Sequence, residues 1–151
     1  MNLTLTVQRL EDSKHIPTDA QFSQWLETTL TGRKESAEIC IRLVGNDESA
    51  ELNQQYRQKK GPTNVLSFNS ALPPALAEHY LLGDLVICVP LVAEEAAAER
   101  ITELAHWAHL VIHGCLHLLG YDHELDNDAE IMEKLETEIM LQLDFTDPYG
   151  V

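Results

Sequence analysis

The stretch from His106 to His123, HWAHLVIHGCLHLLGYDH, decides the fold of this chain. Its apolar residues occur on nearly all sides of a helix, which is typical of a helix buried at the centre of a domain. Five of the seven histidines of the chain also lie in these eighteen residues. At about 100° per residue, the four that precede Gly120 fall within an arc of about 80°. We therefore expect a central helix with a row of histidines along one side.

Three of these histidines have the spacing of a metal site. His113 and His117 are one helical turn apart, so both imidazoles can reach one ion. Gly120 and His123 follow at three-residue intervals, as in the metzincin pattern, where the glycine lets the chain turn and bring in a third histidine. The fragment HxxxHxxGxxH predicts a zinc ion, or another divalent transition metal, bound by His113, His117 and His123. A seam of hydrogen-bonded histidines in the core is the alternative.

Gly114 stands where a metalloprotease of this type carries its glutamate, the general base. Three neutral imidazoles leave one position of a tetrahedral zinc open to water, whose pKa can fall to about 7 without help from a protein base. A peptide bond needs its amine leaving group protonated, whereas a phosphodiester chiefly needs its developing negative charge stabilised. The missing glutamate therefore favours a phosphodiester substrate.

Other side chains could orient the ligands by hydrogen bonding. His109 lies on the same arc as the ligands, and Asp122 directly precedes His123. Asp84, at the start of a predicted strand, is a further candidate. His106 lies roughly 10 Å along the helix axis from His113, which is too far to share its ion.

The chain has 151 residues, the usual size of one domain, so we expect a single domain over residues 1–151. Ten basic against twenty-five acidic side chains give a net charge of −15, which argues against nonspecific attraction to nucleic acid or an anionic membrane. The segment from Leu119 to Val151 holds ten of the acids and only Lys134 as a base. RNA binding would therefore depend on a local basic patch.

The sequence also indicates a compartment. No apolar run approaches the roughly 20 residues of a membrane helix, and the first residues do not have the pattern of a signal peptide. Cys40, Cys88 and Cys115 are odd in number and lack a CxxC spacing, which favours a reducing compartment. We expect a cytoplasmic protein, with Cys115 facing away from the ligands into the core.

Hydrophobic periodicity predicts strands near residues 3–9, 39–44, 65–68 and 83–89. It predicts helices from a Thr18 cap to about Gly32, from an Asp47 cap to about Gln58, from Pro90 through Ala97, and over the histidine stretch. A last helix over 127–143 should turn its acids outward and Ile131, Leu135, Ile139 and Leu143 inward. Residues 71–80 should form a loop. The resulting class is α/β (α+β): one domain with a mixed sheet of about four strands, whose order does not follow from the sequence, packed with helices around the histidine helix.

A second informative stretch is LNQQYRQKKGPTNVLSF, from Leu52 to Phe68. Arg57, Lys59 and Lys60 gather at the predicted end of a helix, where cations also complement the helix dipole without any further role. Arg57 is suited to a phosphate because its guanidinium is a planar, permanently charged fork of donors.

This stretch, LLGDLVIC at Leu81 to Cys88, the histidine stretch, and an acidic helix followed by DPY at Asp147 to Tyr149 together resemble the YbeY family of bacterial ribosomal RNA maturation factors. The similarity covers about Leu52 to Tyr149, and HGCLHLLGYDH is its most specific part. The resemblance implies a single-strand-specific, metal-dependent endoribonuclease acting in small-subunit rRNA maturation and ribosome quality control. It also implies that His113, His117 and His123 bind zinc and that Arg57 is important for activity.

The leading hypothesis is RNA cleavage at this zinc, with Arg57 as the catalytic residue that holds the phosphate. Lys59, Lys60, Asn64 and Ser67 are the candidate RNA contacts. Expected partners are single-stranded rRNA, the small ribosomal subunit and one of its proteins, which would offer a basic surface to the acidic last helix. No membrane or DNA partner is expected. The alternatives are a metallohydrolase of peptides or small molecules, and a non-catalytic ribosome-assembly factor with a structural zinc.

Overall fold

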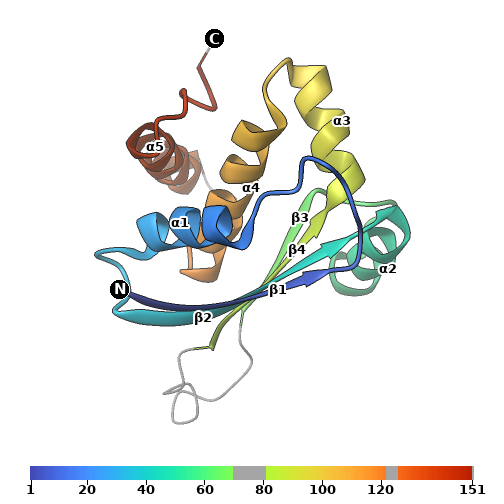
Figure 1. Cartoon of the computed structure of the whole chain (residues 1–151), viewed down its shortest axis with the longest axis horizontal. Helices are drawn as coiled ribbons and strands as arrows, with labels where there is room; N and C mark the ends of the chain where they lie inside the picture. Colours follow the sequence, from blue (N-terminus) through green and yellow to red (C-terminus); the bar gives the residue numbers. More distant parts are fainter. Residues whose placement is uncertain (70–80, 122–125, 151) are drawn as a thin grey trace.

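The computed structural model describes residues 1–69, 81–121 and 126–150 (Figure 1). Within these ranges the chain is a single domain with a four-stranded mixed sheet and five helices, which confirms the predicted class. The predicted loop at 71–80 lies outside the described residues. In chain order the elements are β1 (Asn2–Arg9), α1 (Asp19–Leu30), β2 (Ser36–Val44), α2 (Asn46–Arg57), β3 (Val65–Asn69), β4 (Leu81–Cys88), α3 (Val89–Glu99), α4 (Glu103–Leu118) and α5 (Asp126–Gln142).

The strand order of the sheet is β1-β2-β4-β3. β1 pairs with β2 and β2 with β4 in parallel, whereas β3 runs antiparallel to β4 at the edge. This order places β3, which follows the basic stretch, beside the strand that leads into α3. The edge strand is therefore where the basic stretch and the histidine helix can meet.

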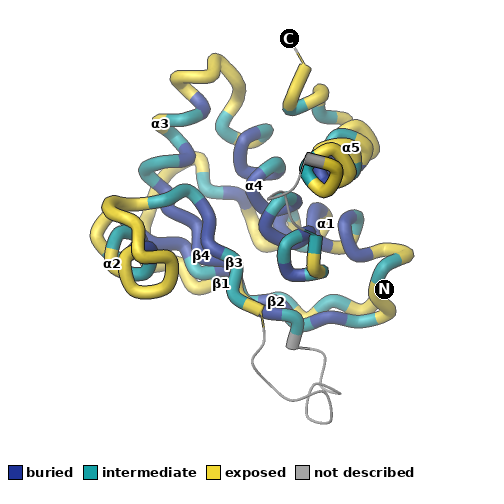
Figure 2. Tube along the Cα trace, turned by 180° about the vertical axis from the view of Figure 1, so that it is seen from behind, coloured by how far each residue is buried: buried dark blue, intermediate teal, exposed yellow. Residues whose placement is uncertain are grey.

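Helices α1 and α4 cover one face of the sheet (Figure 1). Ile39, Ile41 and Leu43 of β2 point into this layer and are fully buried, as are Leu85 and Ile87 of β4. Helix α4 contacts α1, α3, α5, β3 and β4, so it is the central element that the sequence predicted. Figure 2 shows the buried residues gathered along the strands and α4, and the exposed ones on the outer faces of α2 and α5.

On the opposite face, helix α2 lies over one end of the sheet and contacts β4. A small apolar cluster of Val44, Leu66 and Val86 is buried there, with Leu52 and Phe68 packed against it. Side chains of a strand alternate between faces, so Leu66 and Phe68 of β3 face α2 while Val65 and Ser67 face α4. β3 thus joins the two layers.

Helix α4 approaches the sheet most closely at Gly114. A Cβ atom added there would lie 2.8 Å from Leu85 Cδ2, 3.2 Å from Ser67 Oγ and 3.4 Å from Val65 Cγ2. The Ser67 hydroxyl uses this closeness to donate a hydrogen bond to the Gly114 carbonyl at 3.2 Å. Any side chain at this position would displace Leu85 or Ser67, so packing favours glycine here and disfavours the metalloprotease glutamate.

Two predictions about helix ends have different outcomes. Thr18 caps α1 as predicted, and forms a capping box with Gln21. The prediction that Asp47 caps α2 was wrong, because the helix begins at Asn46 and its N-cap is Gly45. A side chain at Gly45 would have to displace the carboxylate end of Glu11. Asp47 lies in the first turn, where its charge still favours the helix dipole.

The predicted inward face of α5 is confirmed for Leu135, Ile139 and Leu143, which pack in or against the core, and was wrong for Ile131. Ile131 is 52% exposed, whereas Met132, Ile139 and Met140 are buried. An acid also lies on the inward side, because Glu136 is one turn from both Met132 and Met140 and is fully buried. Glu136 is the exception to the prediction that the acids of this helix face outward.

Replacement of Gly114 by alanine tests the packing of α4 on the sheet. Overpacking a core costs about 1–3 kcal/mol, and the better helix propensity of alanine returns about 1 kcal/mol. We expect Gly114→Ala to lower the free energy of unfolding in urea by about 1 kcal/mol. The second variant, Leu85→Val, shortens the side chain that the new methyl meets. The double variant should lose less than the sum of the two single losses, and strict additivity would contradict this account.

Candidate active site

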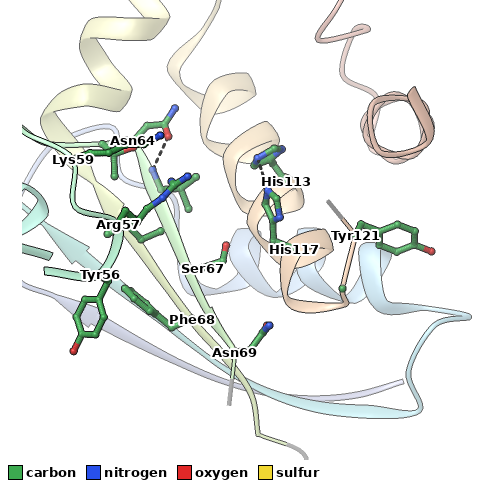
Figure 3. A pocket seen from close by; sticks show the side chains of 14 residues that line it. Tyr56, Arg57, Lys59, Asn64, Ser67, Phe68, Asn69, His113, His117 and Tyr121 are labelled. Atoms are coloured by element: carbon green, nitrogen blue, oxygen red, sulfur yellow. Dashed lines mark hydrogen bonds between the residues drawn. The ribbon is translucent and has the colours of Figure 1, made fainter. Parts of the chain in front are cut away.

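A groove with a volume of about 890 Å³ lies between the end of α2, strand β3 and helix α4 (Figure 3). Arg57 lies on one side of it and points toward His113 and His117 on the other, while Tyr56 and Tyr121 point away. The structure thus brings together two segments that are about fifty residues apart in the chain. The described residues that line the groove are Tyr56, Arg57, Lys59, Thr63, Asn64, Val65, Leu66, Ser67, Phe68, Asn69, His113, His117, Gly120 and Tyr121.

The basic side of the groove is held in place by two buried polar residues of α2. The Ser49 hydroxyl donates to the Thr63 carbonyl at 2.8 Å and accepts from the Thr63 N–H at 3.0 Å. One turn further, the Asn53 amide donates to the Gly61 carbonyl at 2.8 Å. Arg57 follows one turn later on the same face of the helix. The loop after α2 is therefore fastened back onto the helix that carries Arg57.

On the other side, His113 and His117 turn their Nε2 atoms toward each other, 3.1 Å apart. Two nitrogens that bind one tetrahedral zinc at about 2.0–2.1 Å are separated by roughly 3.3 Å, so this spacing fits two ligands of one ion. Nδ1 of His113 hydrogen-bonds the carboxylate of Glu136. An ionised carboxylate only accepts, so the proton of a neutral His113 is on Nδ1, and its Nε2 is the acceptor of the hydrogen bond with His117.

Glu136 is the centre of a polar network between α4, α5 and the C-terminal segment. It is fully buried and accepts from the Tyr149 hydroxyl as well as from His113. His109 Nε2 lies 3.6 Å from Glu136 Oε1 and 3.3 Å from the Tyr149 hydroxyl. Burial alone would raise the pKa of Glu136, but the nearby His109 imidazole and the hydrogen bonds from His113 and Tyr149 outweigh it and lower the pKa to about 2. Burial and the neighbouring Glu136 raise the pKa of the Tyr149 hydroxyl.

The DPY segment places Tyr149 at this network. Oδ1 of Asp147 accepts from the Tyr149 N–H at 2.8 Å and from the Thr137 hydroxyl of α5 at 3.3 Å. The end of the chain is thereby folded back along α5, so that the Tyr149 hydroxyl reaches Glu136. The sequence suggested no function for the DPY motif. Its contacts indicate that it helps to orient His113, because Tyr149 binds the same carboxylate of Glu136 as His113 does.

The groove has a charge opposite to that of the whole chain. Arg57 and Lys59 are basic, and no aspartate or glutamate occurs among its described lining residues. Glu136 reaches only the far side of the His113 ring. A local basic patch of the kind that RNA binding requires is therefore present in a chain of net charge −15.

The remaining predicted site residues have different surroundings. Lys60 is exposed and is not among the described residues of the groove. Asp84 is on the opposite face of β4, in a hollow that it shares with Cys40 and Arg42. The structure therefore does not bring Asp84 to the histidines, because its neighbour Leu85 takes the face toward α4. Burial raises the pKa of the Asp84 carboxyl there.

Two further predictions concern the histidine helix. His106 is buried and hydrogen-bonds Glu95 of α3, so it is separate from the ligand pair. Cys115 is fully buried in the core, as predicted, and burial raises the pKa of its thiol to about 12.

The third predicted ligand, His123, and its neighbour Asp122 lie outside the described residues. Within 1–69, 81–121 and 126–150, no group of three or more histidines, cysteines or acids is arranged to hold a metal. Gly120 does have the predicted turn, since its φ of 101° lies in the left-handed region and α4 ends just before it. The binding of metal by His113, His117 and His123 stays a prediction.

Sequence reasoning missed Glu136, Glu95 and Tyr149. A signal was present for Glu136: it is flanked at four-residue spacing by Met132 and Met140, so an inward face drawn through the methionines would have contained it. No comparable signal marked Glu95, whose partners His106 and Asn64 come from other elements.

Replacement of Glu136 by glutamine tests the network through pH. The pKa of Glu136 is lowered from 4.5 to about 2 in the folded protein. Its charge therefore stabilises the fold above pH 4.5, and this contribution is lost as the pH falls from about 4.5 toward 2. In urea unfolding of EDTA-treated protein, we expect Glu136→Gln to be less stable than wild type at pH 7, with a gap that narrows below pH 4.5. Glu133→Gln, exposed on the same helix, should show no such gap. A gap for Glu136→Gln that does not depend on pH in this window would contradict the network.

The comparisons with known proteins agree with this arrangement. The family model described as Endoribonuclease YbeY matches residues 7–144. Among solved structures, the chain is similar to the solution structure of TM1509 from Thermotoga maritima, with 26% sequence identity and a TM-score of 0.60, over 99% of each chain. The family match extends the resemblance seen from Leu52 to Tyr149 into the N-terminal third. The protein therefore belongs to the YbeY family of endoribonucleases, which are RNA-cleaving hydrolases that act in ribosomal RNA processing.

Proposed function

We propose that this protein is a zinc-dependent endoribonuclease that cleaves single-stranded rRNA during maturation of the small ribosomal subunit, at its 3′ end, and in ribosome quality control. The observation that supports it most is the position of Arg57, which faces His113 and His117 across one groove. This arrangement puts a phosphate-binding side chain opposite two imidazoles with converging nitrogens.

In this proposal each residue has a separate task. His113, His117 and His123 would hold the ion, and Glu136 keeps His113 in the tautomer that binds it. A bound zinc would act as a Lewis acid and as the source of an activated water. Arg57 donates to the oxygens of the scissile phosphate and stabilises the charge that develops there. Lys59 attracts the strand, and Asn64 contacts it.

The groove suits unpaired nucleotides. Its volume of about 890 Å³ falls within the range of sites for small molecules, which is room for a short piece of one strand. Proteins commonly recognise RNA through such unpaired segments, whose phosphates and bases are both within reach of side chains. Ser67 also lines the groove, but its hydroxyl hydrogen is already used in the bond to the Gly114 carbonyl.

The surroundings of Gly114 count against peptide hydrolysis. A metalloprotease glutamate would have to begin with a Cβ where Leu85 and Ser67 already lie. Glu136 does not replace it, because its oxygens are bound by His113 and Tyr149. We therefore do not favour the peptidase alternative.

Docking on the ribosome would use another surface. The outer face of α5 exposes Asp128, Glu130, Glu133 and Glu138, which are suited to a basic ribosomal protein of the small subunit. The described helices include none long and apolar enough to cross a membrane. We propose the cytoplasm as the location, as the cysteine pattern indicated.

Single-turnover cleavage of single-stranded rRNA tests the activity. Arg57→Ala should lower the maximum rate by about 100-fold or more, since it removes a donor that acts on developing charge. His117→Ala should abolish zinc-dependent cleavage. If either variant cleaved as fast as wild type, the observed activity would come from elsewhere. Lys59→Ala and Lys60→Ala form a matched pair: both lysines are exposed, but only Lys59 is among the described residues of the groove, so Lys59→Ala should weaken RNA binding more.

Metal removal separates the enzyme from the assembly factor with a structural zinc. We expect wild type to carry about one zinc per chain by elemental analysis, and chelation to abolish cleavage that added zinc restores. The assembly-factor alternative predicts that chelation lowers the melting temperature and that Arg57→Ala still supports rRNA maturation in cells. Maturation that continued in cells with Arg57→Ala would therefore favour the alternative.

A further inference from the structure

The side chain of Asn64 has a fixed orientation at the edge of the groove (Figure 3). Its Oδ1 accepts from the N–H of Val65 at 2.7 Å, and its Nδ2 donates to the two carboxylate oxygens of Glu95 at 3.2 and 3.4 Å. The reverse assignment would place two donors and two acceptors against each other, so the positions of the oxygen and nitrogen are unambiguous. The amide nitrogen carries two N–H donors, and one of them suffices for the contact with Glu95.

Glu95 is itself held by helix α4. His106 Nε2 lies 2.8 Å from Glu95 Oε1, and because the carboxylate accepts, the imidazole is the donor. The side chain of His106 is only 6% exposed, while that of Glu95 is 34% exposed. Glu99, one turn further along α3, lies 3.9 Å from the other ring nitrogen. A chain of hydrogen bonds thus runs from the buried start of α4 through α3 to the groove.

We propose that Glu95 and His106 are positioning residues that hold the Asn64 amide so that its remaining N–H donates to a backbone phosphate oxygen of the RNA. This inference rests on the proposed function, since it assigns a substrate contact within the same groove. It also gives His106 a task other than metal binding.

The committed groups of Asn64 favour a phosphate over a base. Asparagine reads adenine by donating and accepting at once. Here Oδ1 already accepts from Val65, so the side chain offers chiefly a donor. Arg57 and Lys59 line the same groove and attract the phosphate backbone. Asn64 should therefore contribute to affinity equally for oligonucleotides of different sequence.

A purely electrostatic role and a positioning role of Glu95 predict opposite changes in RNA affinity when Glu95 is removed. A carboxylate close to an RNA groove repels phosphates, so its removal should strengthen binding if charge alone matters. If Glu95 positions Asn64, its removal should weaken binding, because the amide is released. Glutamine at this position keeps an acceptor for Asn64 and can also pair with His106 through the other ring tautomer, so it should restore binding.

The experiment measures Kd for fluorescent single-stranded oligoribonucleotides by anisotropy, and the cleavage rate of the same RNAs in single-turnover assays, with zinc-loaded protein. We expect Asn64→Ala to raise Kd about tenfold, which is the lower range for losing a hydrogen bond to a charged group. Glu95→Ala and His106→Ala should raise Kd several-fold, and Glu95→Gln and His106→Gln should stay near wild type. The control Glu94→Ala removes the same charge from an exposed neighbouring position and should not raise Kd.

A double-variant cycle decides between positioning and general damage. If Glu95 acts through Asn64, Glu95→Ala should have no further effect on Kd in an Asn64→Ala background. Additive effects, or a lower Kd for Glu95→Ala alone, would overturn the inference, as would different losses for Asn64→Ala on oligonucleotides of different sequence. Wild type that binds RNA but does not cleave it would refute the proposed activity and leave the positioning of Asn64 intact. Wild type that does not bind single-stranded RNA would overturn both.

Discussion

The structure depends on one close contact, between helix α4 and the sheet at Gly114. Because no side chain separates them, the Ser67 hydroxyl of the edge strand reaches the helix backbone. A larger residue at this position would move α4 away from β3, and with it the imidazoles of His113 and His117. The width of the groove is therefore set by the absence of a Cβ atom in the middle of the most buried helix. The same glycine that departs from the metalloprotease motif is a condition of the site.

The histidines of α4 are bound by two different carboxylates. Glu95 of α3 hydrogen-bonds His106 near the start of the helix. Glu136 of α5 hydrogen-bonds His113 and lies near His109. Each carboxylate also binds a second polar side chain, Asn64 in one case and Tyr149 in the other. The histidines of α4 are evenly spaced in the sequence, but in the structure they belong to two separate polar networks, one around Glu95 and one around Glu136. The Glu95 network reaches the basic side of the groove, and the Glu136 network orients the predicted metal ligand His113.

The sequence predicted the parts of the site that depend on local spacing. The pairing of His113 with His117, the turn at Gly120 and the burial of Cys115 all follow from helix geometry. The pairing of Arg57 with the histidines came from a family resemblance, because nothing local relates residues that far apart. Contacts that depend on strand order could not be predicted. Asp84 was placed near the ligands, although alternation along β4 turns it to the other face. Glu136 was placed outside, although the buried side of α5 extends to Met132, Glu136 and Met140.

The distribution of acids explains how a chain of net charge −15 can present a site for RNA. Charge on the exposed face of α5 is screened beyond about 8 Å at physiological ionic strength, so its effect on a phosphate in the groove is weak. Among the described residues, two carboxylates contact side chains that line the groove, and both are bound by donors. Glu136 accepts from His113 and Tyr149, and Glu95 accepts from His106 and Asn64. Arg57 and Lys59 therefore set the local potential. The acidic surface is left to act on partners at a distance from the groove, which lets one small domain combine a basic site with an acidic exterior.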